Sequence, residues 1–165
     1  MYEWHKDSEL EILSGWQPRQ SRTNYDTRFR KFLEEPPDDL AVFAIEDSGE
    51  LVGRIELYQI DRRNRNAGMG LIIGEKNKWR RGIGGEAVRL ILDYAFTVES
   101  LEKVYAHVYS FNERALRFMR KAGFVEEGIL RKHESHNGEL QDVHSFGMLR
   151  QEFYQRHQTL FTIPQ

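Results

Sequence analysis

The stretch KNKWRRGIGGEA, residues 76–87, lies between a short apolar run and the start of a long apolar helix pattern. Gly82, Gly84 and Gly85 leave backbone N–H groups unobstructed by a Cβ atom, and a helix that begins here adds unpaired N–H groups and the positive end of its dipole. Four basic side chains precede the helix: Lys76, Lys78, Arg80 and Arg81. The stretch therefore predicts a phosphate site, and the alternative is a tight turn beside a solvated basic edge.

Two known phosphate-binding turns can be compared with this stretch. A P-loop is excluded because neither Lys-Ser nor Lys-Thr follows the last glycine. GIGGEA fits the G-x-G-x-x-A pattern of a dinucleotide-binding turn, but six residues separate Gly74-Glu75 from Gly82. The next strand pattern ends in Ser110-Phe111, not in an acidic residue, and the chain closes with a hairpin instead of further strand–helix units. A nicotinamide-dependent oxidoreductase is therefore disfavoured.

The residues before the stretch predict one helix and three strands. Residues 21–35 place Tyr25 and three further large apolar side chains on one helical face, which indicates an amphipathic helix. Residues 40–45 and 51–60 flank Ser48-Gly49 and predict a hairpin. Residues 61–68 are expected to form a loop, and 69–73 a third strand.

The residues after the stretch alternate between helix and strand patterns. Residues 84–98 predict a mostly buried helix that leaves only Glu86, Arg89 and Asp93 as a narrow charged edge. The later elements are a strand at 104–109, a helix from the N-cap Asn112 to the stop Gly123, and strands at 124–134 and 140–149 around Asn137-Gly138. This order predicts an α/β fold with a mixed sheet and helices on its faces.

Composition limits the class of protein. The 165 residues are 39% apolar and 30% charged, which predicts a single domain: a helical cap at 1–37, a core at 38–153 and a tail at 154–165. With no cysteine, disulfide scaffolds, thiol enzymes and iron–sulfur proteins are excluded. The charges in MYEWHKDSELEIL argue against a signal peptide or membrane span, and the net charge of −2 argues against nucleic acid as a partner. We expect a cytoplasmic protein.

Two motifs make the chain resemble the GNAT superfamily of acetyl-CoA-dependent N-acetyltransferases from about Leu40 to Phe153. The family's Gln/Arg-x-x-Gly-x-Gly/Ala loop corresponds to WRRGIG, residues 79–84, with Trp79 in the first position. Its second motif, Asn before a helix that ends in Lys-x-Gly-Phe, corresponds to Asn112 and residues 121–124. Trp in the first position, with Glu-Ala after the loop, is similar to the branch of ribosomal-protein alanine and spermidine N-acetyltransferases. The fold implied is a mostly antiparallel GNAT-type sheet with acetyl-CoA in the splay between its two central strands.

The resemblance also implies how acetyl-CoA binds. Its diphosphate is expected on backbone N–H groups of the loop, and its pantetheine arm is expected to run as an added strand beside the third strand. A backbone N–H near Ile73 is expected to face the thioester oxygen, and Asn112 to bond an amide of the arm. The expected cofactor-binding residues are Leu71, Ile72, Ile73, Arg80, Arg81, Gly82, Ile83, Gly84, Gly85 and Asn112.

The reaction requires a neutral amine and a proton for the departing thiolate. Glu56, Glu75 and His107 are candidates for the base, although Glu56 could simply pair with Arg54. Many family members place a tyrosine seven residues after the Asn, where this chain has Met119, and a frequent Glu before the loop is Gly68 here. Tyr109 is a candidate for the proton donor. These departures keep open a second hypothesis, a catalytically weak acyl-CoA-binding regulatory module.

The acceptor is not fixed by the sequence: a protein N-terminus, a polyamine or another small amine all remain open. Acidic side chains at 34–39 could form a mouth for a basic acceptor or a solvated loop. His133, His136, His144 and Asp142 match no familiar metal spacing, so we expect a solvated hairpin and no metal. The aromatic tail is expected to pack on the core or on a second subunit. A homodimer is common in the family, and a partner could complete the sheet edge because no strand is evident before residue 40.

Overall fold

The computed structural model describes residues 1–14 and 21–161. One six-stranded sheet forms its centre, in the order β1-β2-β3-β4-β6-β5. The strands are β1 (Ala41–Asp47), β2 (Glu50–Asp61), β3 (Asn66–Ile73), β4 (Lys103–Tyr109), β5 (Val125–His136) and β6 (Glu139–Leu149). The helices are η1 (Tyr2–Lys6), α1 (Ser8–Ser14), α2 (Arg22–Glu34), η2 (Lys76–Lys78), α3 (Ile83–Thr97), α4 (Glu113–Ala122) and α5 (Arg150–Tyr154). The predicted mixed sheet flanked by helices is confirmed.

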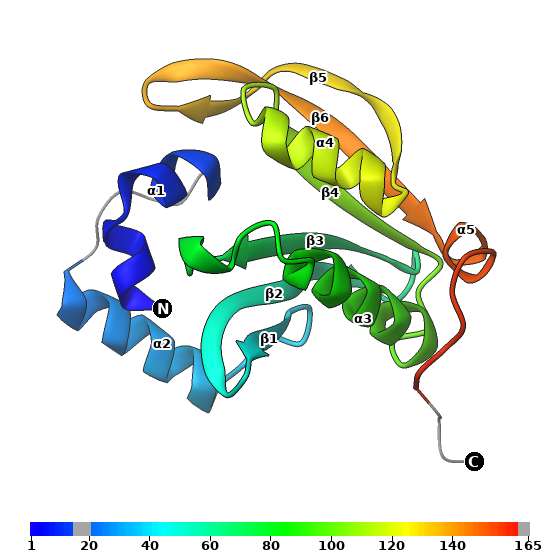
Figure 1. The fold of residues 1–165 in the computed structure, drawn as a ribbon, viewed down its shortest axis with the longest axis horizontal. Helices are drawn as coiled ribbons and strands as arrows, with labels where there is room; N and C mark the ends of the chain where they lie inside the picture. Colours follow the sequence, from blue (N-terminus) through cyan, green and yellow to red (C-terminus); the bar gives the residue numbers. More distant parts are fainter. Residues whose placement is uncertain (15–20, 162–165) are drawn as a thin grey trace.

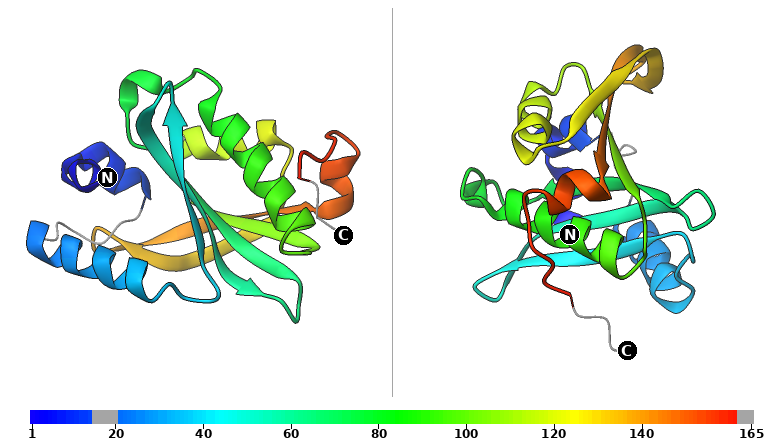
Figure 2. Two further views of the ribbon diagram at one scale, coloured as in Figure 1. Left: turned by 90° about the horizontal axis from the view of Figure 1, so that it is seen from below. Right: turned by 90° about the vertical axis from the view of Figure 1, so that its right-hand side faces the viewer.

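The helices cover the sheet unequally. Figure 1 shows α3 and α4 side by side in front of the strands, and the left view of Figure 2 shows α2 on the opposite face. Apart from the β3–β4 pair, which is parallel, all neighbouring strands run antiparallel. The connection from β3 to β4 passes through α3, as a crossover between parallel strands requires.

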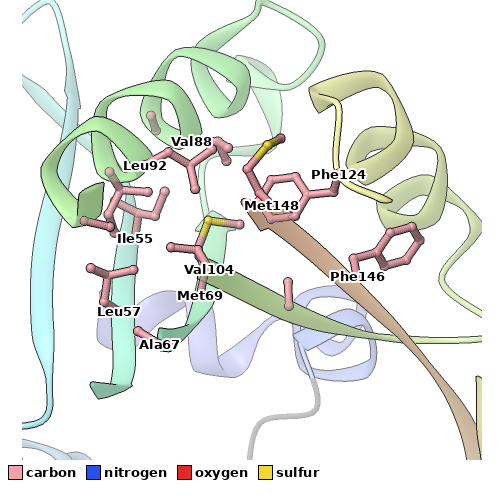
Figure 3. Packing of buried hydrophobic residues seen from close by; sticks show 14 of the residues in the cluster. Ile55, Leu57, Ala67, Met69, Val88, Leu92, Val104, Phe124, Phe146 and Met148 are labelled. Atoms are coloured by element: carbon pink, nitrogen blue, oxygen red, sulfur yellow. The ribbon is translucent and has the colours of Figure 1, made fainter. Parts of the chain in front are cut away.

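The main core lies between α3 and the sheet. Val88 and Leu92 point from α3 toward Ile55 of β2, Met69 of β3 and Val104 of β4, and all five side chains are buried (Figure 3). Burying one such side chain contributes about 1.5–3 kcal/mol. This packing fixes the position of the N-terminus of α3 relative to the sheet.

The predicted turns and caps are confirmed. Asn112 accepts a hydrogen bond from the N–H of Ala115 at 3.1 Å, and Gly123 ends α4 with φ of 93°. Asn137 and Gly138 both have positive φ, 51° and 83°, as a two-residue hairpin requires. The residue types at these positions, a capping Asn and residues that tolerate positive φ, are sufficient to specify these turns.

Two details of the sequence prediction are wrong. β3 begins at Asn66 and not at 69, because residues 66–68 pair with residues 103–105 of β4 and so extend the strand into the predicted loop. Asp93 does not belong to an exposed charged edge, because it is fully buried. The C-terminal tail covers it: the hydroxyl of Tyr154 and the N–H of Leu160 both donate to its carboxylate.

Within the described residues, no strand precedes β1, so β1 and β5 are the two edges of the sheet. The aromatic tail packs on the core as expected, since Phe153 is 1% exposed and lies 5.6 Å from Phe96 between ring centres.

The boundaries 1–37, 38–153 and 154–165 stay a prediction, and α5 crosses the last of them. In the part of the chain that the structure describes, no helix has the length and apolar character needed to cross a membrane.

Candidate active site

The site is built around a gap in the sheet. β3 and β4 pair through only three residues each, 66–68 with 103–105, and then diverge (Figure 1). Gly74 at the end of β3 donates its N–H to Val52 of β2 at 2.9 Å. Since successive residues of a strand point their amide groups to opposite sides, the amide groups of Leu71 and Ile73 face the gap.

A cavity of about 1210 Å³ occupies this gap, and residues from both faces of the sheet line it. Its walls on the core side include Val88, Leu92, Ala106 and Phe118. Its walls on the other side include Arg54, Glu56, His107 and Tyr109. A ligand bound here can therefore pass from the α3–α4 face through the sheet to a polar surface.

The glycine loop forms one mouth of the cavity. Gly82 is the N-cap of α3 with φ of 86°, a left-handed conformation in which a side chain would be strained. The first intrahelical bond runs from the N–H of Glu86 to the carbonyl of Gly82, so the N–H groups of Ile83, Gly84 and Gly85 have no intrahelical partner. A Cβ at Gly85 would meet nothing within 4 Å. The donor set and the open space fit a diphosphate.

The four positive charges predicted beside this loop do not act together. Lys76 forms ion pairs with Asp7 and Glu9 at 2.8 Å, and Lys78 with Asp47 at 2.7 Å. These two lysines therefore connect the loop to the N-terminal segment and to the β1–β2 turn. Within the described residues, no carboxylate pairs with the other two basic side chains, Arg80 and Arg81.

Trp79 joins three elements at the mouth of the cavity. Its Nε1–H donates to the carbonyl of Ile73 at 2.8 Å and so occupies one of the two lone pairs of that oxygen. The guanidinium of Arg114, from the first turn of α4, lies 3.7 Å from the ring centre of Trp79. Arg114 also lines the cavity, and no sequence pattern singled it out. The N–H of Ile73 keeps its predicted orientation toward the gap.

The polar face explains a departure from the family motif. The ring of Tyr58 lies across Gly68, where a Cβ would come within 2.3 Å of it, so the frequent Glu has no room here. Glu56 lies over Gly70 in the same way, with Oε1 3.0 Å from an added Cβ. Arg54 approaches Glu56 at 3.4 Å, which confirms the predicted pair. Glycines in β3 thus make space for side chains of β2.

The candidate proton carriers occupy different places. Glu75 accepts from the indole N–H of Trp4 at 2.9 Å and does not line the cavity, so it anchors the N-terminal segment. Glu56, His107 and Tyr109 all line the cavity. Partial burial lowers the pKa of His107, which favours a neutral imidazole at pH 7.

Tyr109 is held by a residue that the sequence did not reveal. Its hydroxyl donates to Oε2 of Glu134 in β5 at 2.7 Å. Burial and the Glu134 carboxylate raise the pKa of Tyr109 to about 12, so the phenol is protonated at neutral pH. Twenty-five residues separate the two, and only the pairing of β4, β6 and β5 brings them together.

The second family motif has a mainly structural environment. The amide oxygen of Asn112 caps α4, and its Nδ2–H donates to the carbonyl of Leu13 in α1 at 3.1 Å. Asn112 still lines the cavity, so its predicted bond to the pantetheine arm stays a prediction. Met119 is 4% exposed among core residues and also reaches the cavity wall.

The histidines of the final hairpin have other partners. Nδ1 of His144 lies 2.7 Å from a Glu126 oxygen, and Asp142 accepts from the backbone N–H of Lys132 at 2.8 Å. Among the described residues, no group of three or more side chains could hold a metal ion.

Comparisons with known proteins agree with this geometry. Residues 1–125 match the family model described as an acetyltransferase (GNAT) domain. A spermidine N(1)-acetyltransferase of Vibrio cholerae is 30% identical over 148 residues, which cover 88% of this chain and 84% of that protein. An uncharacterized N-acetyltransferase of Bacillus licheniformis, p20, is 32% identical over 66% of this chain, but the match spans only 61% of that protein's length.

A solved structure is similar over nearly the whole chain. The spermidine N-acetyltransferase of Vibrio cholerae in complex with CoA and spermine aligns with a TM-score of 0.83 and 25% identity, over 93% of this chain and 89% of that one. The family model and this similarity place the fold among the acyltransferases. The chain belongs to the GNAT acetyltransferase family, and the predicted acetyl-CoA-dependent N-acetyltransferase activity is supported by these relatives.

Proposed function

We propose that this chain transfers the acetyl group of acetyl-CoA to a primary amine of a polyamine. The observation that carries the proposal is the cavity that crosses the sheet, with unpaired backbone N–H groups at one mouth and the carboxylate of Glu56 at the other. The two spermidine N-acetyltransferase comparisons support a polyamine as the acceptor. Acetyl-CoA supplies the activated acetyl thioester, and the chain supplies binding and proton transfer.

We propose that the residues expected to hold acetyl-CoA act as the sequence predicts. The N–H groups of Ile83, Gly84 and Gly85 bind the diphosphate, and Arg80 and Arg81 lie close enough in sequence to contact its oxygens. Leu71 and Ile72 border the pantetheine arm. The N–H of Ile73 stabilises negative charge on the thioester oxygen. Asn112 forms a hydrogen bond with an amide of the pantetheine arm from the opposite wall of the cavity.

Two residues handle protons in this proposal. Glu56 accepts the proton of the substrate ammonium, directly or through water, so that the neutral amine attacks the thioester carbon. The thiolate leaves as the C–S bond breaks, and no acyl-enzyme forms. Tyr109 donates its hydroxyl proton to the departing thiolate in place of the tyrosine that Met119 replaces, and its phenolate then takes the second proton that the attacking nitrogen loses as it becomes an amide.

The remaining expectations concern location and assembly. We propose that the protein acts in the cytoplasm as a homodimer. The absence of cysteine fits a reducing compartment, and the exposed apolar side chains Val125 and Ile129 on the edge strand β5 fit a subunit contact. Light scattering during size-exclusion chromatography measures the mass of the particle: a monomer at micromolar concentration contradicts the dimer.

An acetyl-CoA consumption assay over spermidine, spermine, monoamines, N-terminal peptides and aminosugars tests the proposed function. We expect turnover with polyamines. Thermal stabilisation by CoA without turnover on any amine would favour the acyl-CoA-binding module, a hypothesis that Met119 keeps open. Stabilisation by NAD(P) and not by CoA would contradict the family assignment of the site.

A further inference from the structure

A carboxylate lies beside the cavity without a basic partner. Glu134 of β5 accepts the hydroxyl of Tyr109, and among the described residues no lysine or arginine forms an ion pair with it. Its charge also contributes to raising the pKa of Tyr58 and opposes the lowering of the pKa of His107, so Glu134 acts on groups of β2 and β4 alike. A carboxylate in this position is suited to bind a cation.

The backbone of β5 is irregular just before Glu134. Leu130 pairs with Val143 of β6, and the next pair is Glu134 with Gln141. Between these two pairs, β5 therefore contains two more residues than β6. Lys132 lies in this irregularity with φ of 50°. Bulges re-aim side chains in this way, and regular alternation in the sequence does not predict them.

The ring of Tyr109, whose hydroxyl binds Glu134, packs against two other aromatic rings, Phe111 and His136. Ring centres lie 5.1 Å apart for Tyr109 and Phe111, 5.2 Å for Tyr109 and His136, and 5.1 Å for Phe111 and His136. Phe111 is 38% exposed, so this cluster is open to solvent. Aromatic faces attract organic ammonium groups, and a nearby carboxylate adds the attraction between opposite charges.

This aromatic cluster lies at the open end of the gap. In Figures 1 and 2 the tip of the β5–β6 hairpin reaches the same end of the molecule as α1 and η2, where β3 and β4 are farthest apart. Tyr109 belongs both to the cluster and to the cavity wall. A substrate whose reacting amine lies in the cavity can therefore extend toward Glu134.

We propose that Glu134, with the rings of Tyr109, Phe111 and His136, binds the second ammonium group of a di- or polyamine acceptor and so selects polyamines over monoamines. The inference rests on the proposed function, because it requires amine acetylation in the cavity. It assigns to Glu134 a role in specificity that is separate from the proton transfer assigned to Glu56.

The test compares acceptors that differ in their second charge. In Glu134→Gln we expect kcat/KM for spermidine to fall about 10- to 100-fold, the range of a lost charged hydrogen bond. We expect kcat/KM for butylamine to fall much less, because the amide oxygen of glutamine still accepts the Tyr109 hydroxyl and only the charge is lost. Glu139→Gln removes a carboxylate from the same hairpin and should leave both values unchanged. Equal losses for both amines in Glu134→Gln, or no loss for either, would overturn the proposal.

A binding measurement separates this inference from the proposed function. Calorimetric titration of spermidine into the CoA-saturated protein needs no turnover, and we expect Glu134→Gln to weaken binding at least tenfold. If the wild type binds spermidine more tightly than Glu134→Gln does but acetylates no amine, the proposed function is wrong and the proposed ammonium site still holds. A wild-type protein that acetylates monoamines and binds no spermidine would contradict the ammonium site alone.

Discussion

Gly84 accepts a Cβ atom without a clash, which makes it the residue for testing the loop. An added Cβ would lie 3.5 Å from Leu71 and 3.7 Å from Phe118, which are ordinary contacts. Gly82 is less suitable because its φ of 86° strains any side chain. A loss of binding at Gly82 would therefore mix backbone strain with the loss of phosphate contacts.

We expect Gly84→Val to weaken acetyl-CoA binding at least tenfold, because the side chain occupies the space of the diphosphate beside the N–H groups. Valine is no worse than glycine inside a helix, so the free energy of unfolding should change by less than about 1 kcal/mol. Titration calorimetry and urea unfolding measure the two effects. The control is Leu90→Val, an exposed position of the same helix, and equal affinities in both variants would contradict the loop assignment.

Glu56 and Tyr109 are expected to affect catalysis more than acetyl-CoA binding. Glu56→Gln and Tyr109→Phe should each lower kcat about 100-fold, in the range of general acid–base catalysis, with little change in the KM for acetyl-CoA. Tyr105→Phe is a matched control, because Tyr105 shares the face of β4 but donates to Gln59 outside the cavity wall. If Tyr109→Phe behaves like Tyr105→Phe in steady-state kinetics, Tyr109 is not the proton donor.

At the scale of elements, Asn112 connects α4 to α1. Asn112→Ala removes the cap and the bond to Leu13, and we expect the free energy of unfolding to fall by about 1–2 kcal/mol. Asn112→Asp keeps a good capping oxygen and loses only the donor to Leu13, so its loss should be smaller. Urea denaturation ranks the three proteins, and equal stability of Asn112→Ala and wild type would show that the cap is unimportant.

The strands β3 and β4 show which element properties the sequence specifies. Their apolar patterns predicted both strands, and the order of the elements predicted a mixed sheet, but not that these two strands form its parallel pair. The family resemblance implied a splay between the two central strands, but not that pairing stops at Gly68 and Tyr105, since that point depends on how α3 and α4 pack against the two halves of the sheet. The irregularity of β5 was missed for the same reason.

At the scale of the whole molecule, the Asp93 carboxylate binds the C-terminal tail to α3 through hydrogen bonds. Burial tends to raise the pKa of this carboxyl, but hydrogen bonds from the N–H of Leu160 and from Tyr154, Thr159 and Thr97 outweigh it, so the pKa is lowered. A lowered folded-state pKa gives stability that is present above the unfolded pKa of about 3.9 and is lost as pH falls through the folded pKa.

We therefore expect Asp93→Asn to lower the free energy of unfolding by about 1–3 kcal/mol at pH 7, with the difference from wild type narrowing below pH 4. The amide of Leu160 should also exchange faster with deuterium. Glu86→Gln, an exposed position of the same helix, serves as the control. A difference from wild type that stays constant from pH 7 to pH 3 would show that the charge of Asp93 does not stabilise the tail.

The sequence by itself determined the order of the elements, the glycine turn at the start of α3, the caps at Asn112 and Gly123, and the family. Each depends on residues close in the chain, whose backbone preferences and periodicity act locally. Only the tertiary structure placed Glu134 beside Tyr109, covered Asp93 with the tail and engaged Lys76 and Lys78 in ion pairs. These contacts join residues between 25 and 69 positions apart, and packing of whole elements, which no local pattern encodes, brings them together.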